Sequence, residues 1–399
     1  MKCGICKQNG HNRRTCSTNE KKTKKIKKVK MTTEPMAAPE PIKKVKKIDH
    51  KSNLIKCFSI LVQYVDAIKQ KNGHFKKRQF NKIIGFLSNY DGIIKDAETV
   101  KQIFINSGMK NPTRTMLKIE EYFKTGTMGD VEKAKENPLV AALQNLTKIY
   151  AIGPSKAIQL NSEHGITTIE ELKKAVVDEP GIINNKQRIG LDYHDDLTQR
   201  IPRSEIDRFK EIVDTFAEEI GVEVSINGSY RRRATTSGDI DLLVKTRPEW
   251  TTPSKIGTAL NMMIEKLKDW TGGSMVKEVL AKGKKKFMGV VYIPGETTIM
   301  RHLDIIETTP EEYPFAQFYF TGSGGFNVKM RKRAIEMGYS LNEYSLTVKK
   351  TKKKVESKII STAIGKDNFG TEKDIFKFLG VDYVEPWDRK GFTLSKLGK

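Results

Sequence analysis

The sequence is short of cysteine, of tryptophan and of long apolar runs. Only four cysteines and three tryptophans occur in 399 residues. No stretch approaches the roughly 18 apolar residues that a membrane-spanning helix needs, and the N-terminal MKCGICKQNG has no apolar signal core. A disulfide framework would spread cysteines along the chain, whereas three of them lie within the first sixteen residues. These absences indicate an intracellular protein that is neither secreted nor bound to a membrane.

Acidic residues are scarce relative to basic ones. The chain has 72 lysines and arginines against 48 aspartates and glutamates, a net charge of +24 and a pI of about 9.6. This excess favours a polyanionic partner, with nucleic acid ahead of an acidic membrane surface, although a solubilising surface would also explain it. The length allows two or three domains, and 37% apolar residues are enough for most of them to fold.

The N-terminal cysteines form a pattern of their own. Residues 3–16 read CGICKQNGHNRRTC, in which Cys3, Cys6, His11 and Cys16 follow the spacing C-x2-C-x4-H-x4-C. Three thiolates and one imidazole suit a closed tetrahedral Zn²⁺ site, and so short a loop has no core without a metal. The spacing resembles that of zinc knuckles, which bind single-stranded nucleic acid. A tail with chance cysteines is the alternative.

The character of the chain then changes twice. Residues 18–50 carry lysine-rich blocks interrupted by PMAAPEP, a composition that buries little apolar surface and predicts disorder. The block KKTKKIKKVK has the composition of a nuclear import signal or a phosphate tether, and a solvated tail is equally compatible with it. From Asn53 apolar residues recur at three- and four-residue steps, which predicts helices that include 78–89, 96–105 and 113–124.

From about Glu205 helical and strand patterns are mixed. Helices are expected over 205–219, 254–269 and 327–337, and strands over 222–226, 239–244, 287–293 and 298–306. The predicted fold class is therefore α+β and multidomain, with helical domains followed by a mixed unit that carries carboxylates on its strands.

The segment 227–244, NGSYRRRATTSGDIDLLV, is the most informative part of the sequence. Asp239 and Asp241 are two residues apart on an expected strand, so both side chains should leave the same face. Carboxylates that close repel each other, and a pair of divalent cations removes this cost. Asp304, in the apolar run TIMRHLDII, is the expected third carboxylate from a neighbouring strand. Because the Gly-Ser turn and three arginines upstream suit phosphate oxygens, the segment predicts two-metal phosphoryl transfer.

This segment resembles the nucleotidyltransferase signature of the family X DNA polymerases. The motifs AIGPSKA, QRIGLDY, QRIPRSE, KGKKKFMGV, YFTGSGGFN, LNEYSL and TEKDIF occur in the order expected of that family. The resemblance covers roughly Asn53 to Arg389 and leaves the zinc knuckle and the linker outside it. It implies a monomeric repair polymerase of base excision repair, which takes gapped or primed double-stranded DNA and dNTPs. It also implies a nuclear location or a site of DNA replication.

The N-terminal patterns and the resemblance together divide the chain into six expected parts. These are a zinc knuckle (1–17), a lysine-rich linker (18–50), a helical lyase-like domain (51–130), a helix-hairpin-helix DNA-binding subdomain (131–204), a nucleotidyltransferase palm (205–309) and a small α/β nucleotide-selecting subdomain (310–399).

The same resemblance implies roles for particular residues. Asp239, Asp241 and Asp304 match carboxylates that bind two Mg²⁺ ions, or Mn²⁺, and Asp304 is placed to take the proton of the primer 3′-OH. The positions that match dNTP-binding residues are Arg200, Ser229, Arg232, Gly238, Tyr319, Phe320, Gly322 and Asn327. Those that match DNA-binding residues are Arg331, Tyr344, Gly153, Lys76 and Lys82.

The helical region resembles the lyase domain of the family. Lys118, in TRTMLKIEEYFKTG, matches the lysine that attacks the sugar aldehyde of an abasic site and releases the 5′-deoxyribose phosphate. A nucleophilic lysine must be partly neutral, so positive neighbours are expected around it. The backbone carbonyls of Thr147, Ile149 and Ile152 match a site for a monovalent cation, Na⁺ or K⁺.

The sequence also departs from the family pattern. SGMKNPTRT stands where the first helix-hairpin-helix has a Gly-x-Gly turn, which puts its cation site in doubt. His302 and Ile306 replace arginines near the third aspartate, Arg233 replaces a glycine, and Gly324 replaces an aspartate. The control of protonation at Asp304 and the fidelity of the enzyme are therefore open.

Two other functions remain compatible with the sequence. A template-independent or RNA nucleotidyltransferase would use the same three aspartates, whereas the Tyr319-Phe320 pair and Arg331 favour a template and a deoxyribose sugar. A non-catalytic nucleic-acid-binding protein would explain the knuckle and the lysines, but the intact aspartates count against it.

Overall fold

The computed structural model describes residues 2, 6, 7, 9, 48–68, 73–90, 92–109, 111–295, 297–390 and 392. The chain divides into two units, Met1–Lys46 and Lys47–Lys399. In the first unit, an isolated antiparallel bridge joins Lys2 to Asn9, and Cys6 is half-buried. Of the expected zinc ligands, Cys3, His11 and Cys16 lie outside the described residues, as does nearly all of the linker 18–50.

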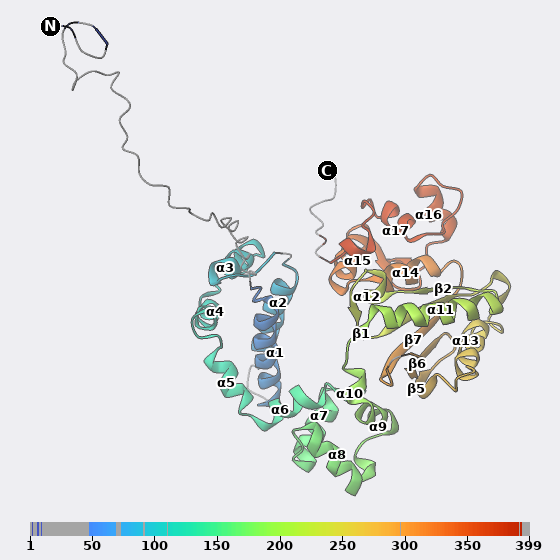
Figure 1. Ribbon diagram of the computed structural model, residues 1–399, viewed down its shortest axis with the longest axis horizontal. Coiled ribbons are helices and arrows are strands. Elements are labelled where there is room, and N and C mark those ends of the chain that lie inside the picture. Colours follow the sequence, from blue (N-terminus) through green and yellow to red (C-terminus); the bar gives the residue numbers. More distant parts are fainter. Residues whose placement is uncertain are drawn as a thin grey trace. The chain divides into compact units, whose positions relative to one another are not determined.

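The second unit begins with helices, as the apolar periodicity predicts (Figure 1). They are α1 (Lys51–Ala67), α2 (Gly73–Ser88), α3 (Ala97–Asn106), α4 (Thr113–Thr125), α5 (Gly129–Lys135), α6 (Pro138–Leu146), α7 (Pro154–His164), α8 (Ile169–Asp178), α9 (Asn185–Asp192) and α10 (His194–Leu197), with a 3₁₀ turn η1 (Pro180–Ile182). One apolar core lies among α1 to α6 and includes Phe58, Phe104 and Ile119. A second lies among α6 to α9 and includes Leu146, Leu160 and Leu172.

The remainder of the chain mixes strands and helices. Its elements are β1 (Ile201–Pro202), α11 (Arg203–Ile220), β2 (Glu223–Ile226), α12 (Gly228–Arg231), β3 (Thr236–Ser237), β4 (Ile240–Lys245), η2 (Pro248–Trp250), α13 (Thr258–Lys268), β5 (Val276–Lys282), β6 (Lys286–Tyr292), β7 (Met300–Thr308), α14 (Tyr313–Thr321), α15 (Gly324–Glu336), β8 (Tyr339–Leu341), β9 (Leu346–Val348), α16 (Ser357–Ala363), α17 (Glu372–Phe378) and η3 (Pro386–Asp388). β5 has no counterpart among the expected strands.

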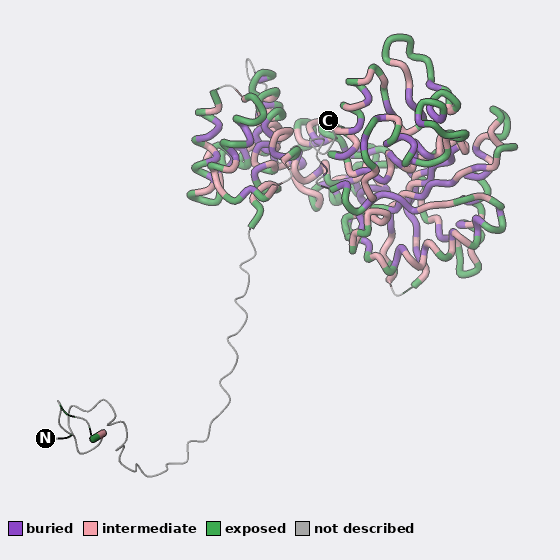
Figure 2. The backbone as a smooth tube through the Cα atoms, turned by 90° about the horizontal axis from the view of Figure 1, so that it is seen from above, coloured by how far each residue is buried: buried purple, intermediate pink, exposed green. Residues whose placement is uncertain are grey.

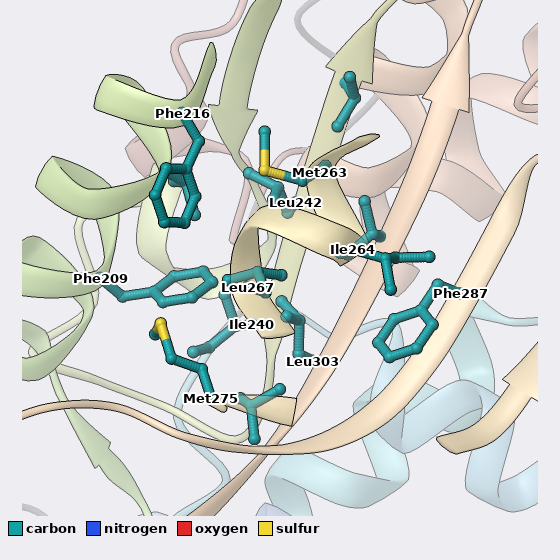
Figure 3. Packing of buried hydrophobic residues seen from close by; sticks show 14 of the residues in the cluster. Phe209, Phe216, Ile240, Leu242, Met263, Ile264, Leu267, Met275, Phe287 and Leu303 are labelled. Carbon is teal, nitrogen blue, oxygen red and sulfur yellow. The ribbon is translucent and has the colours of Figure 1, made fainter. Parts of the chain in front are cut away.

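A five-stranded sheet in the order β2-β4-β7-β6-β5 forms the centre of this part. β4 and β7 run parallel, and every other neighbouring pair runs antiparallel. One face of the sheet is covered by α11 and α13, whose apolar residues pack onto Ile240 of β4 and Leu303 of β7 (Figure 3). In Figure 2 the buried residues lie toward the interior of the tube and the exposed residues on its outer turns.

The other face of the sheet is only partly covered. Leu243 of β4 and Ile306 of β7 pack with Ala316 of α14. Side chains alternate along a strand, so residues two positions apart share a face. Asp241 and Asp304 lie two residues before Leu243 and Ile306 and therefore lie on this same face. The sheet therefore brings carboxylates to the edge of a face that α14 leaves open.

The C-terminal part has its own core. Apolar residues of α14, α15, α17 and the β8–β9 hairpin gather around Phe318, Phe326 and Phe376. In the described part of the chain, no helix is both long and apolar enough to cross a membrane.

Candidate active site

The site is built around two aspartates in register on parallel strands. Asp241 on β4 is the direct neighbour of Asp304 on β7. Asp239 precedes β4, which begins at Ile240, so it lies at the strand end and not on the strand as the sequence pattern indicated. Asp239 is exposed, whereas Asp241 and Asp304 are half-buried. Two of the three expected carboxylates are thus adjacent, and the third stands at the rim.

The charges of these carboxylates act on one another. Burial, followed by the charges of Asp239 and Asp304, raises the pKa of Asp241 to about 7. The Oδ1 atom of Asp304 is buried and accepts no hydrogen bond. A buried acidic group without sufficient compensating charge is costly, so this site would be stabilised by added positive charge.

These oxygens fit a divalent cation. Within the described residues, no three His, Cys, Asp or Glu side chains gather closely enough to hold a metal ion by themselves. Mg²⁺, however, is usually held by one or two carboxylates together with water and substrate phosphates. Asp241 and Asp304 supply hard oxygen donors of this kind, and Asp304 Oδ1 accepts no hydrogen bond from the protein.

A short glycine-containing turn closes over Asp241. Gly228 opens α12 with a φ of +56°, and an added Cβ there would overlap the Oδ2 atom of Asp241. Only glycine therefore fits this position. The next residue, Ser229, donates its hydroxyl to Ser237 Oγ at 2.8 Å. The backbone of this turn is thus packed directly against the Asp241 carboxylate.

Arginines surround the turn. Arg232 donates from Nη1 to the Thr321 carbonyl at 2.6 Å, and burial lowers its pKa while Asp241 and Asp239 oppose that shift. Arg200 donates from Nη2 to the Thr236 carbonyl, also at 2.6 Å. An added Cβ on the exposed Gly238 would lie 3.0 Å from Arg200 Nη1. These contacts place Arg200, Ser229, Arg232 and Gly238 in the segments that adjoin α12 and β3, and their role in binding a nucleotide stays a prediction.

The aromatic pair expected to contact a sugar lies at the end of α14. The rings of Tyr319 and Phe320 meet edge to face, 5.3 Å apart. Gly322 follows at a φ of +59°, a conformation that favours glycine. Asn327 donates from Nδ2 to the Tyr319 carbonyl at 2.8 Å, while its Oδ1 is buried without a partner. Arg331 on α15 and Tyr344 after β8 are exposed.

The residues expected to act in the helical region lie on α2 and α4 and between α6 and α7. Lys118 on α4 pairs with Asp130 on α5. The sequence pattern anticipated positive neighbours, and the structure instead gives Lys118 a carboxylate. Lys76 and Lys82 both lie on α2. The Ile149 carbonyl accepts from the Ile152 amide, Thr147 ends α6, and Gly153 precedes α7.

Sequence reasoning missed several residues beside the site. Lys286 on β6 forms an ion pair with Asp304, with Nζ 3.1 Å from Oδ2. Arg231 on α12 reaches Glu372 on α17 at 2.6 Å and Thr321 Oγ1 at 2.6 Å. The motifs KGKKKFMGV and TEKDIF contain Lys286 and Glu372, but no local pattern connects them to distant partners.

Family models match three consecutive parts of the chain. Residues 144–198 match the fingers domain of DNA polymerase lambda, residues 200–310 the DNA polymerase beta palm and residues 316–390 the DNA polymerase beta thumb. All the residues described above around Asp241 fall within the last two segments.

Curated relatives agree with these models. The chain is 25% identical to a DNA polymerase lambda of Arabidopsis thaliana over 86% of this chain and 62% of that protein. It is 28% identical to a DNA polymerase lambda of Rattus norvegicus over 68% of this chain and 46% of that protein. A type-X family protein, pol4, of Schizosaccharomyces pombe is 24% identical over 67% of this chain and 52% of that protein. The chain spans about half the length of these relatives.

Proposed function

We propose that this chain, whose matches support a family X polymerase, is a DNA-directed DNA polymerase that fills short gaps in repair. The observation that carries the proposal is the register of Asp241 with Asp304, beside a turn that offers Ser229 and Arg232. Carboxylates for cations and guanidinium groups for phosphate are what transfer of a nucleotidyl group requires.

In this proposal Asp239, Asp241 and Asp304 hold two Mg²⁺ ions, or Mn²⁺. The ions would neutralise phosphate charge and make the primer 3′-OH more acidic when bound. Asp304 takes the proton of that hydroxyl, whose oxygen bonds to the α-phosphorus while the bond to the departing pyrophosphate breaks. Arg200, Ser229, Arg232 and Gly238 hold the triphosphate. Catalysis then rests on positioning and charge.

The C-terminal residues would select the nucleotide and the template. Tyr319, Phe320 and Gly322 pack against the sugar, where a 2′-OH would clash. Asn327 reaches the edge of the incoming base, which would give its unpartnered Oδ1 or its amide a ligand. Arg331 and Tyr344 contact DNA, an assignment that their exposure permits.

The remaining activities complete the proposal. Lys118 would form a Schiff base with the sugar and release the 5′-deoxyribose phosphate. Lys76 and Lys82 would bind DNA phosphates, and Gly153 would contact the DNA backbone. Cys3, Cys6, His11 and Cys16 would hold Zn²⁺ in a knuckle for single strands. The Thr147, Ile149 and Ile152 carbonyls would hold Na⁺ or K⁺.

Primer extension on a duplex with a one-nucleotide gap tests the central claim. Asp241→Asn and Asp304→Asn should each abolish templated dNTP addition with Mg²⁺. Asp367→Asn removes an exposed carboxylate outside the site and should leave addition intact. Addition that ignores the template would favour a template-independent transferase. Tight DNA binding without incorporation in Mg²⁺ or Mn²⁺ would instead indicate a binding protein.

A further inference from the structure

A lysine lies against the candidate catalytic carboxylate. Lys286 begins β6 opposite Ile306 of β7, and its side chain reaches diagonally across the sheet to Asp304. Its Nζ is 3.1 Å from Asp304 Oδ2. The lysine side chain is 46% exposed and that of Asp304 only 15%. One partner is therefore anchored, and the other is free to move into solvent.

The second oxygen of Asp304 is not satisfied. Its Oδ1 is buried and accepts no hydrogen bond. His302 Nε2 lies 3.6 Å from it and is also without a hydrogen bond. Among the described residues, the contact with Lys286 is thus closer to the Asp304 carboxylate than the contact with His302. The ammonium stands where a cation is needed.

A divalent cation on Asp304 cannot coexist comfortably with this ammonium. Both need the same carboxylate oxygens, and two positive charges a few ångströms apart repel strongly in a partly buried site. Lysine is a compact charge on a flexible stem, so it can withdraw at small cost. When a divalent cation binds Asp304, it therefore replaces the Lys286 ammonium.

We propose that Lys286 is a positioning residue that holds Asp304 in the metal-free protein and competes with the divalent cation for it. Departure of the Lys286 ammonium becomes part of metal binding. This inference rests on the proposed role of Asp304 as a metal ligand. It goes beyond that role because it states that Lys286, on the neighbouring strand β6, weakens metal binding at Asp304.

Equilibrium binding of Mn²⁺ to the full chain, without DNA or nucleotide, tests the exchange. The free Mn²⁺ signal in electron paramagnetic resonance reports the dissociation constant directly. Lys286→Met should bind Mn²⁺ about fivefold more tightly than the wild type, the size expected for loss of a partly exposed ion pair. Lys286→Arg keeps the charge and should stay close to the wild type.

A control at Lys284 distinguishes the effect of the Lys286–Asp304 contact from the effect of the protein's net charge. Lys284 lies in the turn between β5 and β6 and is exposed, and its Nζ donates to the Pro253 carbonyl. Lys284→Met removes the same charge without touching Asp304. Equal tightening in Lys284→Met and Lys286→Met would overturn the proposal, because net charge alone would then explain the effect. So would an unchanged affinity in Lys286→Met with a wild-type melting curve.

Asp304→Asn distinguishes failure of this inference from failure of the proposed function. If Asp304 is a metal ligand, this variant weakens Mn²⁺ binding, and adding Lys286→Met to it produces no further tightening. If Asp304→Asn leaves Mn²⁺ binding unchanged, the metal site itself is misplaced. If it weakens binding while Lys286→Met still tightens the double variant, the exchange at Asp304 is wrong and the metal site stands.

Discussion

At the scale of single residues, Arg301 and Glu205 form a bidentate ion pair that is almost fully buried. Arg301 on β7 donates from Nε and Nη2 to the two carboxylate oxygens of Glu205 on α11, both at 2.7 Å. Each side chain is 2% exposed. The bidentate geometry satisfies both partners, but either one left alone would be a buried charge without compensation.

Removing one partner of this pair should destabilise the protein strongly. Glu205→Gln is expected to lower the free energy of unfolding by about 3–5 kcal/mol, because the Arg301 charge stays buried. Urea denaturation followed by circular dichroism measures the change. Glu223→Gln, which breaks the exposed pair with Lys245, should cost no more than about 1 kcal/mol. Similar losses in the two variants would contradict the argument.

The lyase activity, if present, should be restrained by a single carboxylate. Lys118 is paired with Asp130, and its side chain must leave that carboxylate before the nitrogen can attack an aldehyde. Asp130→Asn should therefore increase borohydride trapping of the chain on incised abasic-site DNA several-fold. Glu132→Gln removes a carboxylate from the same helix that pairs with Lys135, and trapping should not change. Trapping that persists in Lys118→Ala would assign the nucleophile elsewhere.

At the scale of elements, α12 and α17 are tied by a charged cluster. Arg231 on α12 binds Glu372, the first residue of α17, at 2.6 Å. Arg389 lies 3.0 Å from the other Glu372 oxygen as an ion pair without hydrogen-bond alignment, and its guanidinium is packed among four aromatic rings. The turn that carries Ser229 and Arg232 is thus connected directly to the C-terminal core.

This cluster should make stability depend on pH. Burial alone would raise the pKa of Glu372, but the hydrogen bond from Arg231 and the charge of Arg389 lower it on balance. A lowered folded-state pKa contributes stability above the unfolded value of about 4.3, and that contribution disappears as pH falls through the folded pKa. Glu372→Gln should therefore be less stable than the wild type at pH 7, with the gap closing toward pH 3. Urea denaturation across this range measures it.

A control keeps this prediction specific. Glu265→Gln breaks an exposed pair with Lys268 on α13. Its free energy of unfolding should differ from that of the wild type by the same small amount at every pH. A gap between Glu372→Gln and the wild type that does not narrow in acid would show that the Glu372 carboxylate is not the source.

Local patterns predicted the elements better than the contacts between them. The expected helix 205–219 corresponds to α11, which buries one apolar face, and the strand 298–306 to β7, whose Leu303, Ile305 and Ile306 are buried. The helix expected from 254 begins only at Thr258, after Gly257 at a φ of +98°. β5 reads VKEVLAK and is largely exposed at the sheet edge, so it gave no apolar signal.

The candidate site divides in the same way. The sequence predicted Asp239, Asp241 and Asp304 as carboxylates of one site from the two-residue spacing of the first pair, the apolar run around Asp304 and the family resemblance. It could not give the register of Asp241 with Asp304, nor the contacts of Lys286 and Asp130, because these join elements far apart in the chain. The zinc knuckle stays a prediction, because Cys3, His11 and Cys16 lie outside the described residues.

At the scale of the whole molecule, positive charge concentrates in places that the fold leaves unpaired. The turn after β9 reads KKTKKK over residues 349–354, and all five lysines are exposed. In the part of the chain that the structure describes, none of these five forms an ion pair, although many other lysines do. Five unpaired cations on one turn form a surface suited to a phosphate backbone.

Salt dependence of DNA binding tests this surface. Changing Lys349, Lys350 and Lys353 together to Gln should weaken binding and reduce the slope of log K against log salt by about 0.9 for each lysine that neutralises a phosphate. Fluorescence anisotropy with a gapped duplex measures both. The control variant changes three other exposed lysines to Gln, namely Lys255, Lys358 and Lys377. An equal loss of slope in the control would assign the effect to net charge.

The parallel pairing of β4 with β7 sets an order of assembly. Because the two strands point the same way, the chain must pass through η2, α13, β5 and β6 before β7 can join β4. Contacts so distant in sequence form late, since the entropy of closing the intervening loop is lost before the contact is gained. The helices before Ile201 rely on local contacts and can form earlier. A chain emerging from the ribosome would thus acquire basic helical surface well before its two aspartates become neighbours.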